Sequence, residues 1–401
     1  MLSSSFFSIS LLGLLSVVSL EVTVTAADKI NIVPGKAFDR FITIWLENQD
    51  YAKTLVDEAM VDMARQGIQL ERYYAQTHPS QPNYIAAVGG DYFGLDHDER
   101  VRIPQNVSTV VDLFDTRGIS WAGYFEDIPS PGYMGDASDG KTGNDGWDYV
   151  RKHNPFVSYD SINKNGSRLL NLLSLADFKR ALEQRAVPQF VFISPNMMND
   201  GHNTTLDHAT NWSRELMKLI LLPEAFDEPT LVMLTFDESE AYNEPNHIGT
   251  LLLGSAIPPK LKNTKDATFY THYSILSTIE YNWDLPNLGR YDVGANIFRW
   301  VGEATGYDVA ARLRDPTNAD TVKNSFSYPG FLNQDESKWL PIPVPNLNLV
   351  GSSGKSVAEA VVKNWQSAVD KHTPYDGSGK VQDGEENLPV YKPPGGNREG
   401  A

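Results

Sequence analysis

The chain lacks cysteine and is short of basic residues. With no Cys among 401 residues, disulfides, thiolate metal ligands and a cysteine nucleophile are excluded. Asp and Glu number 51 against 34 Lys and Arg, which gives a formal net charge of -17. So acidic a chain is repelled by phosphate backbones and by anionic lipid surfaces. Nucleic acid is therefore not expected as a partner, and neither is a stable membrane association.

The N-terminal apolar run is also too short for a comfortable membrane span. It extends from Phe6 to Leu20 and is followed by small residues up to Ala27. This pattern is typical of a cleaved secretory signal, although a buried N-terminal helix is the alternative. We predict a signal peptide over 1–27 and a secreted protein, in the extracellular, cell-wall or periplasmic space. Four N-x-Ser/Thr sequons agree with secretion and N-glycans: Asn106, Asn165, Asn203 and Asn211.

What the chain does have is a large apolar content arranged in short blocks. Hydrophobic residues make up 41% of the sequence, enough for a sizeable core. Continuous apolar runs, separated by helical patterns, predict an α/β fold with a mostly parallel central sheet and helices on both faces. The predicted strands are 41–46, 119–124, 189–194, 230–236 and 250–254, and helices are predicted around 55–67, 83 onward, 109–114, up to 185, 272–283 and 357–371.

The composition changes near residue 307. We predict a catalytic domain over 28–306 and a C-terminal extension over 307–401 with a Pro/Gly-rich flexible tail. A Gly- and Asp-rich stretch over 127–160 is interpreted as an insertion, either shaping a pocket or lying on the surface.

Ser80 is the predicted nucleophile. Pro79 and Pro82 restrict the backbone on either side of Ser80 and can present its hydroxyl at a turn. A serine hydroxyl attacks well only when a base or a metal ion favours its alkoxide. Asn83 can donate its amide to a phosphate oxygen. The alternative reading of this segment is an ordinary turn that caps a helix.

Acidic pairs follow two of the predicted strands. Glu47 and Asn48 come directly after the first strand, and Asp237 and Glu238 follow the strand that ends at Phe236. The carboxyl ends of parallel strands meet at one edge of a sheet, where ligand sites lie. Such oxygen ligands suit a divalent ion, Mg²⁺, Ca²⁺, Mn²⁺ or Zn²⁺. These residues are the predicted metal ligands.

Histidines and one further carboxylate complete the predicted site. Asp200 is predicted to bind phosphate or metal, because the adjacent glycine permits close approach. The candidates for the general acid are His202 and His272, with His78 as a substrate contact near Ser80 and His247 as a weaker candidate. We interpret the remaining histidines as surface residues: His97, His153, His208 and His372.

The order of these motifs resembles that of a known family. Ser80-Gln81-Pro82-Asn83 is similar to the nucleophile segment of nucleotide pyrophosphatases and other enzymes of the alkaline phosphatase superfamily. The Glu47-Asn48, Asp200-Gly201-His202, Asp237-Glu238 and His272-Tyr273 motifs resemble the phosphoesterase branch, which includes bacterial phospholipases C and secreted fungal acid phosphatases. The resemblance covers about Phe38 to Asp292.

The resemblance implies an alkaline-phosphatase-like three-layer sandwich and a covalent phosphate on Ser80. It makes His202 and His272 contacts of the phosphate or the leaving group. Alkaline phosphatase uses more Asp and His ligands than this chain offers, which leaves the metal's number and identity open. A glycan on Asn203, beside His202, would crowd the pocket.

The resulting hypothesis is a secreted, metal-dependent acid phosphatase that hydrolyses small phosphomonoesters. Two alternatives stay open: a phospholipase C-type phosphodiesterase using the same site, and a catalytically inactive secreted glycoprotein.

Overall fold

The computed structural model describes residues 30–137, 148–316, 323–368 and 373–380. The predicted signal peptide, His372, the tail beyond 380 and part of the 127–160 stretch lie outside the described residues. The domain boundaries predicted from composition stay predictions.

The centre of the molecule is one sheet of eight strands in the part of the chain that is described. Its strand order is β4-β3-β5-β1-β6-β7-β2-β8. All neighbours pair in parallel except β7, which runs antiparallel to both β6 and β2. The predicted α/β class with a mostly parallel sheet is confirmed. The strands are β1 (Arg40–Leu46), β2 (Ile68–Tyr74), β3 (Trp121–Phe125), β4 (Leu172–Ser174), β5 (Phe190–Ser194), β6 (Thr230–Phe236), β7 (Thr250–Leu253) and β8 (Thr264–Thr271).

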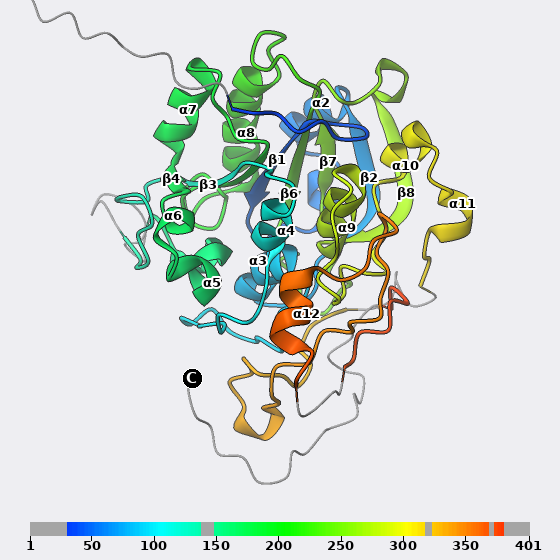
Figure 1. Ribbon diagram of the computed structural model, residues 1–401. Helices are drawn as coiled ribbons and strands as arrows, with labels where there is room; N and C mark the ends of the chain where they lie inside the picture. The colour runs from blue at the N-terminus through cyan, green and yellow to red at the C-terminus, as the bar shows by residue number, and fades with distance from the viewer. Residues whose placement is uncertain (1–29, 138–147, 317–322, 369–372, 381–401) are drawn as a thin grey trace, which may run out of the picture.

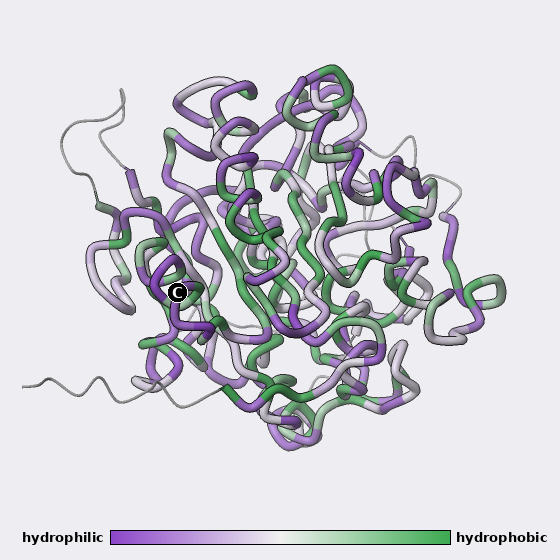
Figure 2. Tube along the Cα trace, turned by 90° about the horizontal axis from the view of Figure 1, so that it is seen from above, coloured by the Kyte–Doolittle hydropathy of each residue, from purple (hydrophilic) through white to green (hydrophobic). Residues whose placement is uncertain are grey.

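Strand β1 lies at the centre because its residues are apolar on both sides. All seven of its residues are buried between β5 and β6, where Ile44 is opposite Ile193 on one side and Leu234 on the other. Strands that are covered on both faces read as continuous apolar runs. Figure 2 shows this hydrophobic interior and the hydrophilic loops around it.

Helices cover both faces of the sheet. Helix α2 packs against α8 and β7, whereas α3 packs against α4 and α9, which Figure 1 shows in front of the sheet. The α-helices are α1 (Tyr51–Thr54), α2 (Glu58–Ala64), α3 (Ser80–Gly89), α4 (Val110–Asp115), α5 (Asp160–Asn163), α6 (Gly166–Leu169), α7 (Leu175–Glu183), α8 (Leu206–Ile220), α9 (Tyr273–Asn282), α10 (Arg299–Thr305), α11 (Val309–Arg312) and α12 (Glu359–Trp365).

Several boundaries differ from the prediction. The helix expected around 55–67 is α2, and it begins only at Glu58 because the Asp57 side chain caps it by accepting from Met60 N at 2.9 Å. The short helix α1 precedes the predicted span. Strands β4 and β8, at the two edges of the sheet, and β2 were not predicted. The sequence of β8, TKDATFYT, carries charges because much of it faces solvent.

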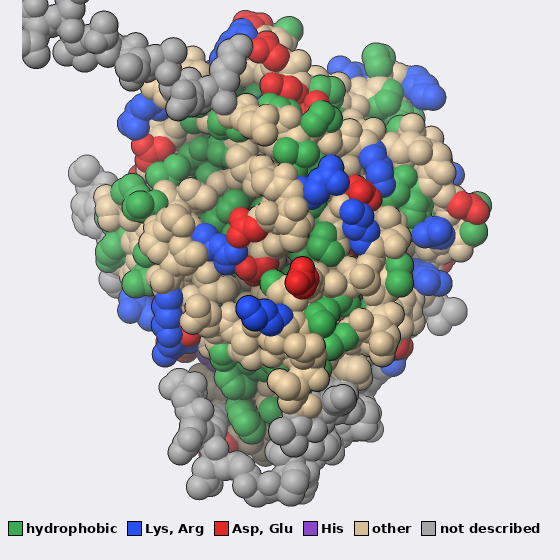
Figure 3. All heavy atoms as spheres, viewed as in Figure 1, with side chains coloured by type: hydrophobic (Ala, Val, Ile, Leu, Met, Phe, Trp, Pro, Cys, Tyr) green, Lys and Arg blue, Asp and Glu red, His purple; other side chains and the backbone are tan. Residues whose placement is uncertain are grey.

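The described part of the C-terminal extension packs on the core. Val361 and Trp365 of α12 belong to the hydrophobic core, and the buried Tyr375 hydroxyl accepts from Arg290 Nη1 at 2.9 Å. In the described residues no helix has the length and apolar character needed to cross a bilayer. The face in Figure 3 intersperses acidic, basic and hydrophobic side chains, with no large region of one sign.

Candidate active site

The polar side chains predicted to meet do so at the carboxyl edge of the parallel strands. Glu47 follows β1, Asp237 follows β6, and Ser80 begins α3 after the loop that leaves β2. These three residues are at most 1% exposed. Glu47 and Asp237 therefore meet because β1 and β6 are parallel neighbours, and Ser80 reaches them from β2, which runs in the same direction two strands beyond β6.

The Ser80 hydroxyl faces two carboxylates. Its Oγ donates to Glu47 Oε1 at 2.7 Å and lies 3.1 Å from Glu238 Oε1. A hydroxyl in this position has proton acceptors within reach, as an activated nucleophile requires.

Asn83 holds the loop that carries Ser80. Its Oδ1 accepts from the backbone N–H groups of Gln76 at 2.8 Å and Thr77 at 3.3 Å. Its Nδ2 donates to the carbonyls of Thr77 at 2.8 Å and Pro79 at 3.3 Å. Since both ends of the amide bind backbone, Asn83 acts here as a positioning residue, and its predicted phosphate contact stays untested.

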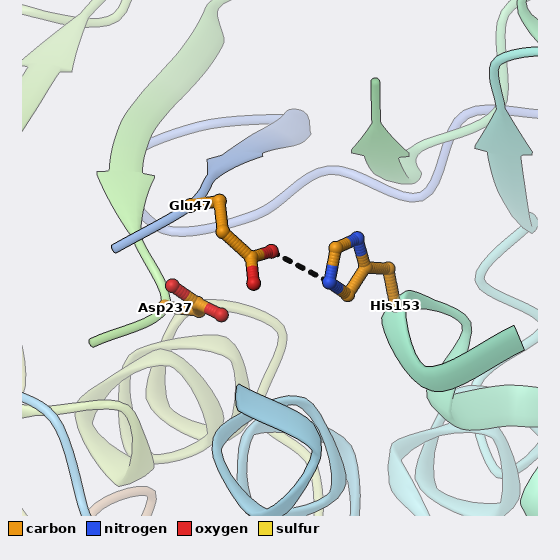
Figure 4. A group of neighbouring side chains, drawn as sticks. All are labelled: Glu47, His153 and Asp237. Carbon is orange, nitrogen blue, oxygen red and sulfur yellow. Dashed lines mark ion pairs between the residues drawn. The ribbon is translucent and has the colours of Figure 1, made fainter. Parts of the chain in front are cut away.

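Buried oxygen atoms gather beside the serine. Ligand atoms of Glu47, His153 and Asp237 lie within 4.8 Å of one another, and Figure 4 shows these side chains pointing toward a common centre. Asp237 Oδ1 accepts from Asn48 N at 3.1 Å and from Glu238 N at 2.7 Å. Asp237 Oδ2 is buried and has no hydrogen-bond partner among the described residues.

The amide of Asn48 faces the same carboxylates. Turned with its nitrogen toward them, it donates to Asp237 Oδ1 at 3.3 Å and to Glu238 Oε1 at 3.0 Å. The unpartnered Asp237 Oδ2 and the neighbouring ligand atoms of Glu47 and His153 fit a divalent cation. Glu47 and Asp237 are two of the four predicted ligands, and the metal contacts predicted for Asn48 and Glu238 stay predictions.

The crowded carboxylates keep protons more strongly than usual. Burial, and beyond it the charge of Glu47, raises the pKa of Asp237. Burial, followed by the charges of Asp237 and Glu47, raises the pKa of Glu238. Like charges in a dry site cannot all ionise unless a cation compensates them.

His153 was wrongly interpreted as a surface residue. It is 2% exposed, and its Nε2 lies 2.6 Å from Glu47 Oε2 while its Nδ1 lies 3.4 Å from Asp200 Oδ2. Asp200 therefore lies behind the imidazole and orients it, as outer carboxylates do at metal centres. His153 has no predicted strand end and no glycine beside it that would have marked it as a site residue.

Lys152 is a second residue that the sequence did not single out. Its Nζ lies 3.4 Å from Glu47 Oε1 and 3.1 Å from Asp98 Oδ2, with the side chain 15% exposed. Burial alone would raise the pKa of Glu47, but the charges of His153 and Lys152 hold it well below its usual range. Burial would lower the pKa of His153, yet Glu47 and then Asp200 raise it to about 9.

His202 lies at the solvent side of this cluster. Its side chain is 30% exposed, and its Nε2 is 3.9 Å from Glu47 Oε1. His78 is fully buried, with Nδ1 2.5 Å from Glu238 Oε2 and its ring stacked on Tyr242 at 3.9 Å. Burial lowers the pKa of His78 to about 4.

The two other histidine candidates contact backbone carbonyl oxygens. His272 Nε2 is 2.7 Å from the Asp237 carbonyl oxygen, and burial lowers the pKa of His272 to about 4. This contact supports the strand end that carries Asp237. His247 lies 2.8 Å from the Glu71 carbonyl oxygen and stacks between Tyr51 and Tyr74, away from Ser80.

The sequons differ in exposure. Asn106 and Asn165 are exposed, whereas Asn203 and Asn211 are partly buried. Asn203 Oδ1 is 3.1 Å from His202 Nδ1, and Asn211 lies within α8, where its amide donates to the Asp207 carbonyl at 2.7 Å. The first two are the better placed to carry a glycan.

A buried serine beside clustered carboxylates, at the edge of an α/β sheet, is the arrangement of a hydrolase that acts on phosphate esters. The phosphoesterase family model matches residues 46–286, and the chain belongs to this family. The match spans Glu47, Ser80, Asp237 and His272.

Fungal relatives match most of the chain. A probable acid phosphatase of Kluyveromyces lactis is 44% identical over 86% of this chain and 80% of its own length. An acid phosphatase of Aspergillus fumigatus is 45% identical over 83% of this chain and 74% of its own length. A phosphatidylinositol-3-phosphatase of Mycobacterium tuberculosis is 25% identical over 72% of this chain and 92% of its own length.

Solved structures are more distant. A protein in the alkaline phosphatase superfamily from Vibrio parahaemolyticus has a TM-score of 0.41 at 12% identity, covering 65% of this chain and 71% of its own. A putative sulfatase from Bacteroides thetaiotaomicron has a TM-score of 0.44 at 12% identity, covering 67% and 74%.

Proposed function

We propose that the chain is a metal-dependent acid phosphatase that hydrolyses small phosphomonoesters through a phosphoserine on Ser80. The observation that carries the proposal is the Ser80 hydroxyl held 2.7 Å from Glu47 at the edge of a buried carboxylate cluster. The names of the fungal relatives support the activity, and the converging oxygen atoms support the metal.

The cation would be held by Glu47, Asn48, Asp237 and Glu238. When bound, such an ion neutralises the carboxylates and stabilises negative charge on an attacking or leaving oxygen. Its identity among Mg²⁺, Ca²⁺, Mn²⁺ and Zn²⁺ is open, because oxygen donors with one nearby imidazole suit each of them.

The residues of the chain supply position and charge. Glu47 Oε1 accepts the proton of the Ser80 hydroxyl as its oxygen attacks phosphorus and the bond from phosphorus to the ester oxygen breaks. Lys152 and the protonated His153 add positive charge on the side of Glu47, which favours an anionic ester. Asp200 keeps the His153 ring in place.

We assign protonation of the leaving oxygen to His202. Among the histidines that the structure describes near Ser80, this ring is partly exposed, so that a leaving group can reach it. An imidazole donates a proton to a leaving group only in its charged form. The names of the fungal relatives agree with turnover that is greatest in acid.

The test measures phosphate release from p-nitrophenyl phosphate across pH, with and without a chelator. Ser80→Ala should lower kcat at least about a thousandfold. Ser213→Ala is the matched control, since Ser213 is equally buried but lies in α8. Acid quenching during turnover should trap phosphate on the peptide that contains Ser80. Substantial turnover by the Ser80→Ala protein would refute the covalent route.

The phospholipase C-type alternative has less support. An apolar pocket beside Ser80 would favour a lipid substrate, but none of the predicted site residues lines the large apolar cavity in the described part of the chain. Comparing p-nitrophenyl phosphate with bis(p-nitrophenyl) phosphate separates the two activities. Faster cleavage of the diester would reverse the assignment, and cleavage of neither would favour the inactive glycoprotein.

Secretion and N-glycosylation belong to the same proposal. Removal of 1–27 and glycans at Asn106 and Asn165 are expected when a eukaryotic secretory host makes the protein. N-terminal sequencing and a shift in mobility after endoglycosidase treatment check both. An intact N-terminus in the secreted protein would refute the signal peptide.

A further inference from the structure

A half-exposed aromatic ring lies beside the carboxylate cluster. Tyr242, in the loop that follows β6, is 50% exposed. One face of its ring stacks on the imidazole of His78, with 3.9 Å between the ring centroids and 30° between the ring planes. Because one face is covered and half of the residue is still exposed, the other face of the ring is open to a ligand.

His78 connects this ring to the nucleophile. Its Nδ1 lies 2.5 Å from Glu238 Oε2, and the other oxygen of that carboxylate lies 3.1 Å from Ser80 Oγ. Burial, and after it the charge of Glu238, raises the pKa of Tyr242 to about 12. The phenol therefore keeps its proton at neutral and acid pH, and it presents an uncharged ring next to the site.

The loop holds the ring in place before a ligand arrives. Ala241 N donates to Asp50 Oδ1 at 2.9 Å, and the backbone carbonyl of Tyr242 accepts from Ser325 Oγ. A tyrosine has only two side-chain torsions, so little rotamer freedom remains to be lost once its backbone is tied. A ring fixed in this way binds a ligand with a small further cost in conformational entropy.

The geometry of the proposed reaction directs the ester group of a substrate toward this ring. In an in-line displacement the leaving oxygen lies opposite the attacking oxygen. Ser80 is only 1% exposed, so the ester group extends from phosphorus toward solvent. The charges of Asp98 and Lys152 act on the Tyr242 hydroxyl, and these side chains are 32% and 15% exposed. Of the three, Tyr242 offers the large apolar surface.

Building on the proposed phosphatase activity, we propose that Tyr242 is a specificity-determining residue whose open face stacks on the ring of an aryl phosphomonoester. A stacked aromatic pair is favourable beyond the apolar area that it buries, and an alkyl ester has no ring to stack. Tyr242 therefore favours esters of phenols over esters of small aliphatic alcohols. His78 supports the covered face of the same ring.

Replacing the ring tests this role in the full-length protein. Tyr242→Ala removes the ring, whereas Tyr242→Phe, the matched control, keeps the ring and removes only the hydroxyl. Tyr242→Ala should lower kcat/KM for phenyl phosphate about 3–10-fold and leave kcat/KM for ethyl phosphate within about twofold of the parent. Tyr242→Phe should stay within about twofold of the parent on both substrates. An equal fall for both esters, no fall for phenyl phosphate, or an equal loss in Tyr242→Phe would overturn the proposal.

Binding of phosphonates, which have no ester bond to break, separates this inference from the proposed function. In titration calorimetry Tyr242→Ala should raise Kd for phenylphosphonate about 3–10-fold and leave Kd for methylphosphonate unchanged. If the parent binds both with this contrast but hydrolyses neither ester, the proposed function fails and the role of Tyr242 stands. If the parent hydrolyses phenyl phosphate but the substitution changes both Kd values alike, or if the parent does not bind phenylphosphonate, the role of Tyr242 fails alone.

Discussion

Glu280 makes the stability of the protein depend on pH. It is fully buried in α9, and neither of its carboxyl oxygens has a donor among the described residues. The neighbouring carboxyl of Asp292 instead accepts from Leu288 N at 2.6 Å and Arg290 N at 2.7 Å. The stable arrangement therefore leaves the proton on Glu280, which donates to Asp292. Burial, and after it the charge of Asp292, raises the pKa of Glu280 well above its usual range.

The magnitude follows from proton linkage. An unfolded Glu loses its proton near pH 4.3, whereas the folded Glu280 keeps it, so the folded state binds more protons as pH rises. The free energy of unfolding then falls by somewhat more than about 1 kcal/mol per pH unit, or by roughly 2 to 3 kcal/mol between pH 5 and pH 7. This contribution to the free energy of unfolding is fully present below pH 4 and is lost as the pH rises.

Glu280→Gln is the perturbation that isolates this effect. A Gln amide donates to Asp292 without titrating, so the variant and the parent should have similar Tm values at pH 5. At pH 7 the variant should melt about 3 °C higher. Glu303→Gln is the control, because that side chain is 49% exposed in an i,i+4 pair. Scanning calorimetry between pH 5 and pH 7 measures the two Tm values. Plots of Tm against pH that run parallel for parent and variant would refute the reasoning.

Three further predictions concern the site. Asp200→Asn keeps an oxygen that accepts from His202 N but removes the charge facing His153, and kcat should fall about 10–100-fold. The control is Asp207→Asn, on the exposed start of α8, which should leave kcat unchanged. Equal kcat values in the two variants would exclude the orienting role of Asp200. Lys152→Met should raise KM for a phosphomonoester about tenfold with a smaller change in kcat, and an unchanged KM would remove Lys152 from phosphate binding. Asn83→Ala should lower the free energy of unfolding in urea by about 2 kcal/mol, whereas a loss below 0.5 kcal/mol, roughly one weak hydrogen bond, would contradict its positioning role.

The sequence predicted the centre of the sheet better than its edges. Strands β1, β5 and β6 are covered on both faces, and their apolar runs show this directly. Strands β4 and β8 lie at the edges of the sheet. Solvent admits charged residues into β8, and β4 has only three residues, too few to show a pattern. The sequence analysis placed the start of α3 near Asn83, whereas the helix begins at Ser80. The two prolines around Ser80 concealed a first helical turn that is wholly buried.

Site residues that directly follow a strand could be predicted from the sequence, whereas those in loops could not. Glu47 and Asp237 directly follow buried strands, so their meeting could be inferred from parallel order alone. Lys152 and His153 come from a short 3-10 turn, Arg151–His153, outside the sheet. No periodicity relates that turn to β1, and only tertiary packing brings its imidazole to Glu47. The role of His153 was therefore invisible in one sequence.

The antiparallel direction of β7 has a consequence for how the enzyme can diversify. Since β6 and β7 are adjacent and antiparallel, the loop over 237–249 begins and ends at the same edge of the sheet. Asp237 and Glu238 lie at the start of this loop, whereas Tyr242 lies nearer its middle, is half exposed and stacks on His78. Substitutions in the middle of the loop can therefore change which alcohol group of a substrate fits, while the two carboxylates keep their positions.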